Sequence, residues 1–83
     1  MSREIPSGWQ RRDEGLVREF VFKDFKQAFG FMVQVALLSE QQGHHPYWNN
    51  VWNKVRIVLN THDAGGRVTE KDYALAEAIN TLL

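Results

Sequence analysis

The sequence predicts an α+β fold: a four-stranded antiparallel sheet with two helices packed on one face, in the order β-β-α-β-β-α. Two observations predict it. Apolar residues alternate with a period of two in short segments, and they recur at steps of three and four in two longer segments. A third observation is the length of 83 residues, which is enough for one hydrophobic core only, so we expect a single domain over residues 1–83.

The first half of the chain predicts a hairpin followed by a helix. Residues 1–8 are expected to be a loose lead-in. Trp9–Arg12 and Leu16–Phe22 are predicted as strands around the turn Asp13-Glu14-Gly15. A helix then begins after an Asp24 N-cap, runs to about Gln42 and stops at Gly43. Its core-facing stripe is predicted to be Phe25, Ala28, Phe29, Met32, Val33, Ala36 and Leu37.

The second half repeats this pattern. Pro46–Val51 and Val55–Thr61 are predicted as strands joined by a tight turn at residues 52–54. Thr69 to Asp72 fits a capping box for the last helix. The apolar residues of that helix are Tyr73, Leu75, Ala76, Ile79, Leu82 and Leu83. Packing both helices on one face of the sheet would bury both apolar stripes in one core.

The composition excludes several classes of function. Ten basic and ten acidic side chains give zero formal charge, so direct nucleic-acid binding is not expected. The absence of cysteine excludes disulfides, thiolate nucleophiles and cysteine-ligated zinc. No apolar run is long enough for a membrane span or a signal peptide, so we expect no membrane association and a cytoplasmic location.

Three histidines are the candidates for chemistry. His44 and His45 follow the predicted helix end, and His62 follows the last predicted strand. If that strand returns past the start of the preceding one, all three histidines meet at one edge of the sheet. Glu40, one helical turn before His44, can reach the same corner. Imidazoles transfer protons near neutral pH, so this corner is a candidate acid–base site.

Other interpretations of these residues stay open. The histidines could be solvated, or could interact with the terminal carbonyls of the helix. With Glu40 they could bind zinc, but adjacent histidines tend to point apart and no spaced pair exists, so we expect no metal. The tryptophans Trp9, Trp48 and Trp52 are expected to pack in the core or hairpins, or to stack on a flat heterocycle.

The chain resembles the pterin-4a-carbinolamine dehydratase family. The resemblance rests on the segment Glu40-Gln41-Gln42-Gly43-His44-His45-Pro46, followed by Trp52, His62 and Asp72, and it extends from about Trp9 to the C-terminus. The flanking segments Phe22 to Phe25 and Ala28 to Met32 match as well. Family members usually carry a helix before the first strand, for which the eight residues before Trp9 are too few. We expect that difference to affect stability and assembly rather than chemistry.

The resemblance implies a dehydratase that converts 4a-hydroxytetrahydropterins to quinonoid dihydropterins during tetrahydrobiopterin recycling, without a cofactor. It implies that His44 and His62 are the acid–base pair, and that His45 holds the substrate. The substrate-binding residues that it implies are Glu40, His44, His45, Pro46, Thr61, His62, Asp63 and Ala64. Asp72 is expected to be a helix cap or loop anchor. The implied partners are a pterin, a second copy or three further copies of the chain, and an aromatic amino acid hydroxylase as functional partner.

Two alternatives belong to other classes. Some family members act as dimerisation partners of a transcription regulator, and the exposed surface of the last helix, with Leu82 and Leu83, would then be the interaction surface. The chain could also bind pterins without turning them over. An enzyme needs His44 and His62, whereas an interaction module does not.

Overall fold

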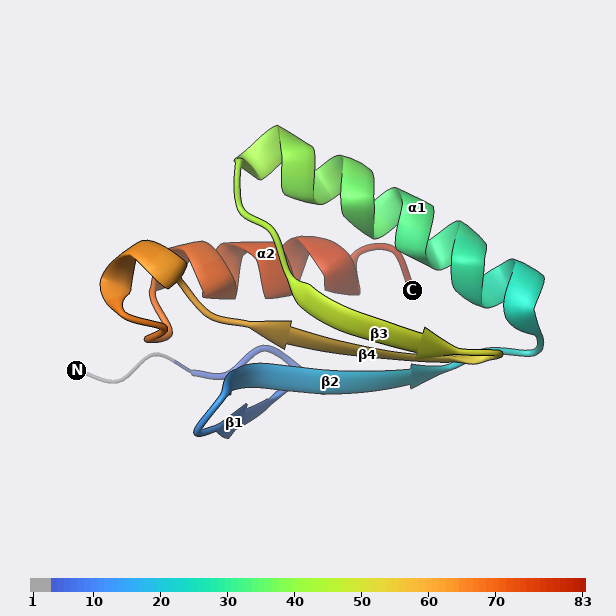
Figure 1. Cartoon of the computed structure of the whole chain (residues 1–83), viewed down its shortest axis with the longest axis horizontal. Coiled ribbons are helices and arrows are strands. Elements are labelled where there is room, and N and C mark those ends of the chain that lie inside the picture. Colours follow the sequence, from blue (N-terminus) through green and yellow to red (C-terminus); the bar gives the residue numbers. More distant parts are fainter. Residues whose placement is uncertain (1–3) are drawn as a thin grey trace.

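A computed structural model describes residues 4–83 and shows the predicted order of elements (Figure 1). No helix within these residues is long and apolar enough to cross a membrane. The elements are β1 (Gln10–Arg12), β2 (Gly15–Val21), α1 (Phe25–Gln42), β3 (Tyr47–Val51), β4 (Lys54–Leu59), a single 3₁₀ turn η1 (His62–Ala64) and α2 (Glu70–Asn80). The α+β fold class predicted from the sequence is therefore confirmed.

The four strands form one antiparallel sheet in the order β1-β2-β4-β3. Leu16 of β2 lies opposite Leu59 of β4, and Val58 of β4 lies opposite Tyr47 at the start of β3. The end of β4 and the start of β3 therefore lie at the same end of the sheet. This register brings residues 60–63 beside the segment that connects α1 to β3.

Both helices cover the same face of the sheet, as predicted (Figure 1). Phe20 of β2 and Phe31 of α1 contact each other across this interface, with ring centroids 4.7 Å apart. The core consists of buried residues from the sheet, both helices and the segment before β1: Trp9, Leu16, Phe20, Ala28, Phe31, Val35, Val55, Ile57, Leu59, Leu75, Ala76 and Ile79.

The predicted core face of α1 is largely wrong. The buried residues of α1 are Ala28, Phe31, Val35 and Ser39, and of the predicted stripe only Ala28 is among them, with Met32 partly buried. Phe29 is 53% exposed and Leu37 is 66% exposed. The physical reason is that α1 is apolar on two adjacent arcs of its surface, and steps of three and four residues trace either arc. Phe25, Phe29, Val33 and Leu37 form an exposed apolar face, which we call the outer α1 face.

The predicted loose lead-in also differs from the structure. Residues 1–3 lie outside the described residues, but residues 5–8 are fixed against the fold. Ile5 packs against the core, and the carbonyl of Ser7 accepts hydrogen bonds from Arg18 Nη1 and Asn80 Nδ2. The oxygen Asn80 Oδ1 in turn accepts from Trp9 Nε1 at 2.9 Å and from Arg18 Nη1 at 2.8 Å. This network joins the start of the described chain to the end of α2.

Candidate active site

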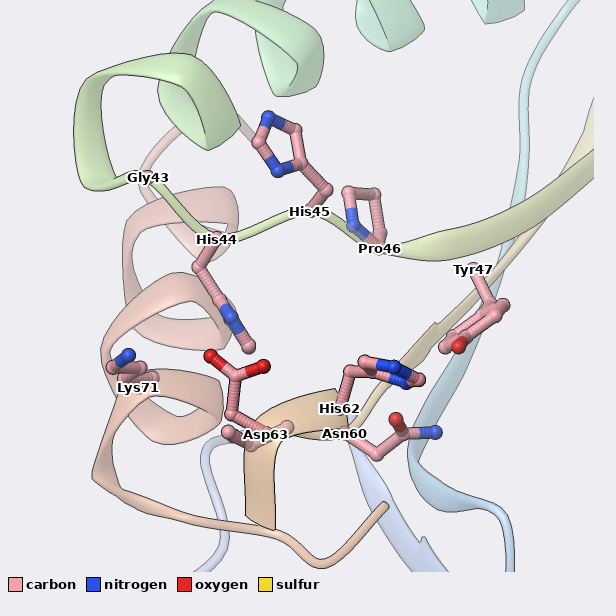
Figure 2. Close-up of a pocket in the computed structure, with 10 residues that line it drawn as sticks. Gly43, His44, His45, Pro46, Tyr47, Asn60, His62, Asp63 and Lys71 are labelled. Atoms are coloured by element: carbon pink, nitrogen blue, oxygen red, sulfur yellow. The ribbon is translucent and has the colours of Figure 1, made fainter. Parts of the chain in front are cut away.

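A cavity of about 370 Å³ lies where the α1–β3 connection meets the end of β4 (Figure 2). Its volume is in the range of small-molecule sites. One wall comes from the α1–β3 connection, another from the segment after β4, and one residue from the first turn of α2. The lining residues are Gly43, His44, His45, Pro46, Tyr47, Asn60, Thr61, His62, Asp63 and Lys71.

His44 is held by the way in which α1 ends. Gly43 adopts a left-handed conformation with φ 65°, which favours glycine, and the backbone N–H of His44 then donates to the carbonyl of Ser39 at 3.0 Å. This turn directs the imidazole inward, where the residue is only 8% exposed. His44 Nε2 lies 2.5 Å from Oδ1 of Asp72 in α2. The side chain is therefore both a wall of the cavity and a partner of a buried carboxylate.

Asp72 is completely buried. Its Oδ2 atom accepts a hydrogen bond from Thr61 Oγ1 at 2.8 Å and another from the backbone N–H of Thr69 at 2.8 Å. The Thr69 contact caps the start of α2, as the capping-box pattern predicts. With His44 on Oδ1, the carboxylate meets three polar groups, which offsets the cost of burying it.

His45 points away from the other two histidines in Figure 2, toward the end of α1. Its Nε2 atom lies 2.5 Å from Oε1 of Glu40, and both side chains are exposed, at 62% and 77%. Because this pair is open to solvent, it contributes little to stability. Its ring lies on the rim of the cavity.

His62 and Asp63 enter the cavity from the side opposite His44. Both belong to the 3₁₀ turn η1 that follows β4, and both are exposed. Figure 2 shows the imidazole of His62 extending toward Tyr47, while the carboxylate of Asp63 points toward His44. The cavity therefore has one buried imidazole on one wall and one solvated imidazole on the other.

Six of the eight residues predicted for substrate binding line this cavity, and two do not. Glu40 reaches it only through His45, and Ala64 turns its backbone N–H to the carbonyl of Thr61. The residues not predicted are Gly43, Tyr47, Asn60 and Lys71. Three of them, Gly43, Tyr47 and Asn60, are sequence neighbours of predicted residues, so the sequence could have indicated them. No sequence signal indicated Lys71.

The other predicted candidates lie elsewhere. No group of three or more histidine, aspartate or glutamate side chains within residues 4–83 could hold a metal ion. Trp9 is buried, Trp48 is partly buried against the core, and Trp52 is 63% exposed in the β3–β4 turn. Trp9 and Trp48 therefore pack in or against the core, Trp52 is exposed at the hairpin turn, and none of the three lines the cavity.

A second hollow on the sheet shares Tyr47 and Asn60 with the first. It also contains Glu14 and Arg56, whose side chains form an ion pair at 2.7 Å. The hydrogen bond from Arg56 holds the pKa of Glu14 below its usual value, and the same bond raises the pKa of Arg56. Since these two are the charged residues that line it, the hollow carries no net charge.

The fold and the cavity define a class: a small α+β protein with a histidine-lined pocket of the size of a small-molecule site. The sequence model of the pterin 4 alpha carbinolamine dehydratase family matches residues 1–82. The chain belongs to this family, and its enzyme class is that of the hydro-lyases, as the sequence predicts.

Individual relatives agree with this assignment. A protein of Rhodopseudomonas palustris (strain BisB18), provisionally named pterin-4-alpha-carbinolamine dehydratase, is 54% identical over 82 residues, which are 96% of this chain and 79% of the relative. A Nitrobacter hamburgensis protein with the same provisional name is 54% identical over 92% of this chain and 76% of its own length. The crystal structure of a transcriptional coactivator/pterin dehydratase from Brucella melitensis is similar with a TM-score of 0.85. It is 46% identical, over 92% of this chain and 82% of that one.

Proposed function

We propose that the cavity dehydrates a 4a-hydroxytetrahydropterin to the quinonoid dihydropterin by histidine acid–base catalysis, with His44 and His62 as the pair. The observation that carries the proposal is that these two imidazoles enter one cavity from opposite walls, His44 from the α1–β3 connection and His62 from η1. A proton donor and a proton acceptor on opposite sides of a flat ring suit an elimination across one bond of that ring.

The only chemical steps that the protein's side chains have to perform are proton transfers. The C4a–O bond breaks as one histidine donates a proton to the departing hydroxyl, which leaves as water. The other histidine accepts the proton of N5, and the electron pair of the N–H bond becomes the second bond between N5 and C4a. One imidazole loses a proton and the other gains one, and exchange with solvent restores both.

The remaining wall residues are suited to hold a pterin. Tyr47 offers an aromatic face and a hydroxyl, and Asn60 offers both a donor and an acceptor. Backbone groups of residues 44–46 and 61–64 flank the two histidines, and we assign them contacts with the polar edge of the ring. His45, on the rim with Glu40, is assigned to substrate binding rather than proton transfer.

Kinetics of single variants test this proposal. Positioned proton transfer contributes about 10²–10⁴-fold to a rate, so His44→Ala and His62→Ala should each lower kcat by that order while the circular dichroism spectrum stays native. The rate is followed by ultraviolet absorbance on a hydroxypterin generated in place by a hydroxylase. His45→Ala is the matched control, and it should raise KM more than it lowers kcat. A folded wild-type protein that does not accelerate the dehydration would overturn the proposal. The alternative of pterin binding without turnover would then remain to be measured.

We further propose that the chain assembles into a homodimer or homotetramer through the outer α1 face. Its exposed apolar side chains are Phe25, Phe29, Val33 and Leu37, on the side of α1 turned away from the core. The sequence indicates Leu82 and Leu83 of the last helix as an alternative interaction surface. In the structure both residues follow the end of α2 at Asn80, where Leu82 is partly buried against the core and Leu83 is 61% exposed. An aromatic amino acid hydroxylase fits as the functional partner, because it would supply the hydroxypterin.

The Brucella neighbour is described as both a coactivator and a dehydratase. For this chain, a role as a protein-interaction module is a second candidate function, and the specific observation that favours it is again the outer α1 face. Purified chain mixed with a candidate regulator in a pull-down experiment tests it. Loss of binding in a variant with a charge on this face, but not in His62→Ala, is the expected result.

A further inference from the structure

We propose that Asp72 is a positioning residue, which fixes His44 as the tautomer with its proton on Nε2 and leaves Nδ1 as the ring nitrogen that exchanges a proton with the substrate. The second part of this statement rests on the proposed function, and the first does not. The sequence indicates only a cap or anchor at this position. The structure shows that the two oxygens of the carboxylate have different partners.

The Oδ2 atom must act as an acceptor. One of its partners is the backbone N–H of Thr69, which can only donate. The other is the hydroxyl of Thr61, which donates at 2.8 Å. The Oγ1 atoms of Thr61 and Thr69 are 2.5 Å apart. Because the Thr61 proton is directed to Asp72, the Thr69 hydroxyl must donate to Thr61, and the chain of donors ends at the carboxylate.

The Oδ1 atom then determines the tautomer of His44. A carboxylate that accepts two hydrogen bonds on Oδ2 offers only acceptor sites, so the nitrogen 2.5 Å from Oδ1 has to carry a proton. That nitrogen is Nε2. In the neutral ring, Nδ1 therefore has the free electron pair. Since Asp72 is fully buried and His44 nearly so, water does not compete for this contact and the ring orientation is fixed.

The same contacts explain how one residue can be both a cap and a positioning group. Oδ2 faces the first turn of α2 and holds Thr69, while Oδ1 faces the α1–β3 connection and holds His44. The start of α2 and the α1–β3 connection are therefore joined through a single carboxylate. A substitution that keeps the shape of Asp72 but replaces one acceptor oxygen by a hydrogen-bond donor would separate the two roles.

Asp72→Asn is that substitution. The amide oxygen must remain on the Thr61 and Thr69 side, because both partners donate there. The amide NH₂ group then faces His44, which can accept only through a bare Nε2, so the ring is expected to switch to the Nδ1–H tautomer. An electron pair would no longer be available on Nδ1, and kcat is expected to fall about 10²–10⁴-fold with a smaller change in KM.

The tautomer is read directly from ¹⁵N and ¹H correlations of the His44 ring, at a pH where the ring is neutral. Wild type is expected to show Nε2–H and Asp72→Asn to show Nδ1–H. Thr69→Ala is the matched control, because it removes the Thr69 hydroxyl but keeps its backbone N–H. It is expected to lower Tm while leaving the His44 tautomer unchanged.

An Nδ1–H tautomer in wild type would overturn the inference, and this measurement needs no folded variant. Retention of both Nε2–H and wild-type kcat in Asp72→Asn would overturn it as well. The outcome is separable from that of the proposed function. A wild-type protein with the Nε2–H tautomer and no dehydratase activity would refute the reaction but support the role of Asp72 in positioning the ring.

Discussion

Gly15 is the residue at which the sheet is least tolerant of a side chain. Its φ is 137°, and a Cβ atom there would lie 2.2 Å from the carbonyl oxygen of Leu59 on the neighbouring strand. No flexible side chain can move aside, because the obstacle is backbone. The start of the pairing between β2 and β4, where Leu16 lies opposite Leu59, therefore depends on glycine at position 15.

We predict that Gly15→Ala lowers the free energy of unfolding by about 2–3 kcal/mol, because it adds both backbone strain and a clash. Gly30→Ala is the matched control. Gly30 lies in α1 with open space around it, so alanine there is expected to stabilise the protein by up to about 1 kcal/mol. Urea denaturation of both variants measures the difference. Equal effects of the two substitutions would contradict this assignment.

Some contacts of the candidate site could be predicted from the sequence and others could not. Strand order and turn positions alone predicted that His44, His45 and His62 lie around one cavity, but not that His45 points away from the other two. The link from His44 to Asp72 could not be predicted from spacing, because 28 residues separate them and Asp72 is already explained by its position at a helix start. Lys71 reaches the cavity only because α2 begins beside it, which depends on the path of residues 65–69.

At the scale of elements, the two ends of α1 have different roles, one in stability and one in forming the cavity. At its start, Asp24 Oδ1 accepts the backbone N–H of Gln27 at 2.9 Å. At its end, Gly43 turns the chain into the cavity. The 18 residues between them extend about 27 Å, so a change at the first end should not reach the second.

We predict that Asp24→Ala lowers the free energy of unfolding by about 1 kcal/mol, because it removes the N-cap hydrogen bond, and that kcat and KM stay at wild-type values. Asp24→Asn keeps an oxygen acceptor at the same place and is expected to retain most of the stability. Thermal unfolding and steady-state kinetics on the three proteins provide the comparison. A large kcat loss in Asp24→Ala would show that the two ends of α1 are coupled.

The bounds of α1 were predictable and its orientation was not. Asp24 and Gly43 mark the ends chemically, because one side chain caps and the other residue accepts a left-handed backbone. The orientation depends on which apolar arc the sheet covers. Phe31 and Val35 face the core, while Phe29 and Val33, equally apolar, face outward. Periodicity within one chain cannot distinguish an arc that meets the sheet from an arc that meets another surface.

At the scale of the whole molecule, the proposed assembly rests on the outer α1 face. Phe29 and Leu37 are more than half exposed, and they lie two turns apart on the same side of the helix. A contiguous exposed apolar surface favours an interaction site, which supports the proposal. The proposed assembly therefore depends on this face and not on the cavity.

We predict that Phe29→Glu and Leu37→Glu each convert the assembled protein to a folded monomer, because a charge in an apolar interface is not solvated. Sedimentation velocity measures the change in mass, and circular dichroism checks the fold. Gln34→Glu introduces the same charge on another exposed part of α1 and should leave the mass unchanged. If wild type sediments as a monomer, the proposed homo-oligomer is refuted.

The overall architecture was predictable because each half of the chain carries a complete local pattern: a turn, an alternating strand and a capped amphipathic helix. The central pairing of β2 with β4 had no local signal, since these strands come from different halves. It is specified by burial, because Leu16, Phe20, Val55, Ile57 and Leu59 all need the same covered face. A sequence shows that such residues must be buried, but not which of them lie side by side.

The hydrogen bonds from Trp9 and Arg18 to Asn80 have a consequence for synthesis on the ribosome. Residues 7–9 emerge well before their partner in α2, because Asn80 lies 71 positions after Trp9. The hairpin of β1 and β2 can form early, whereas the closing contacts wait until Asn80 has left the exit tunnel. Asp72, which holds His44, likewise emerges 28 positions after that histidine. The nascent chain therefore stays without a finished site until α2 has emerged.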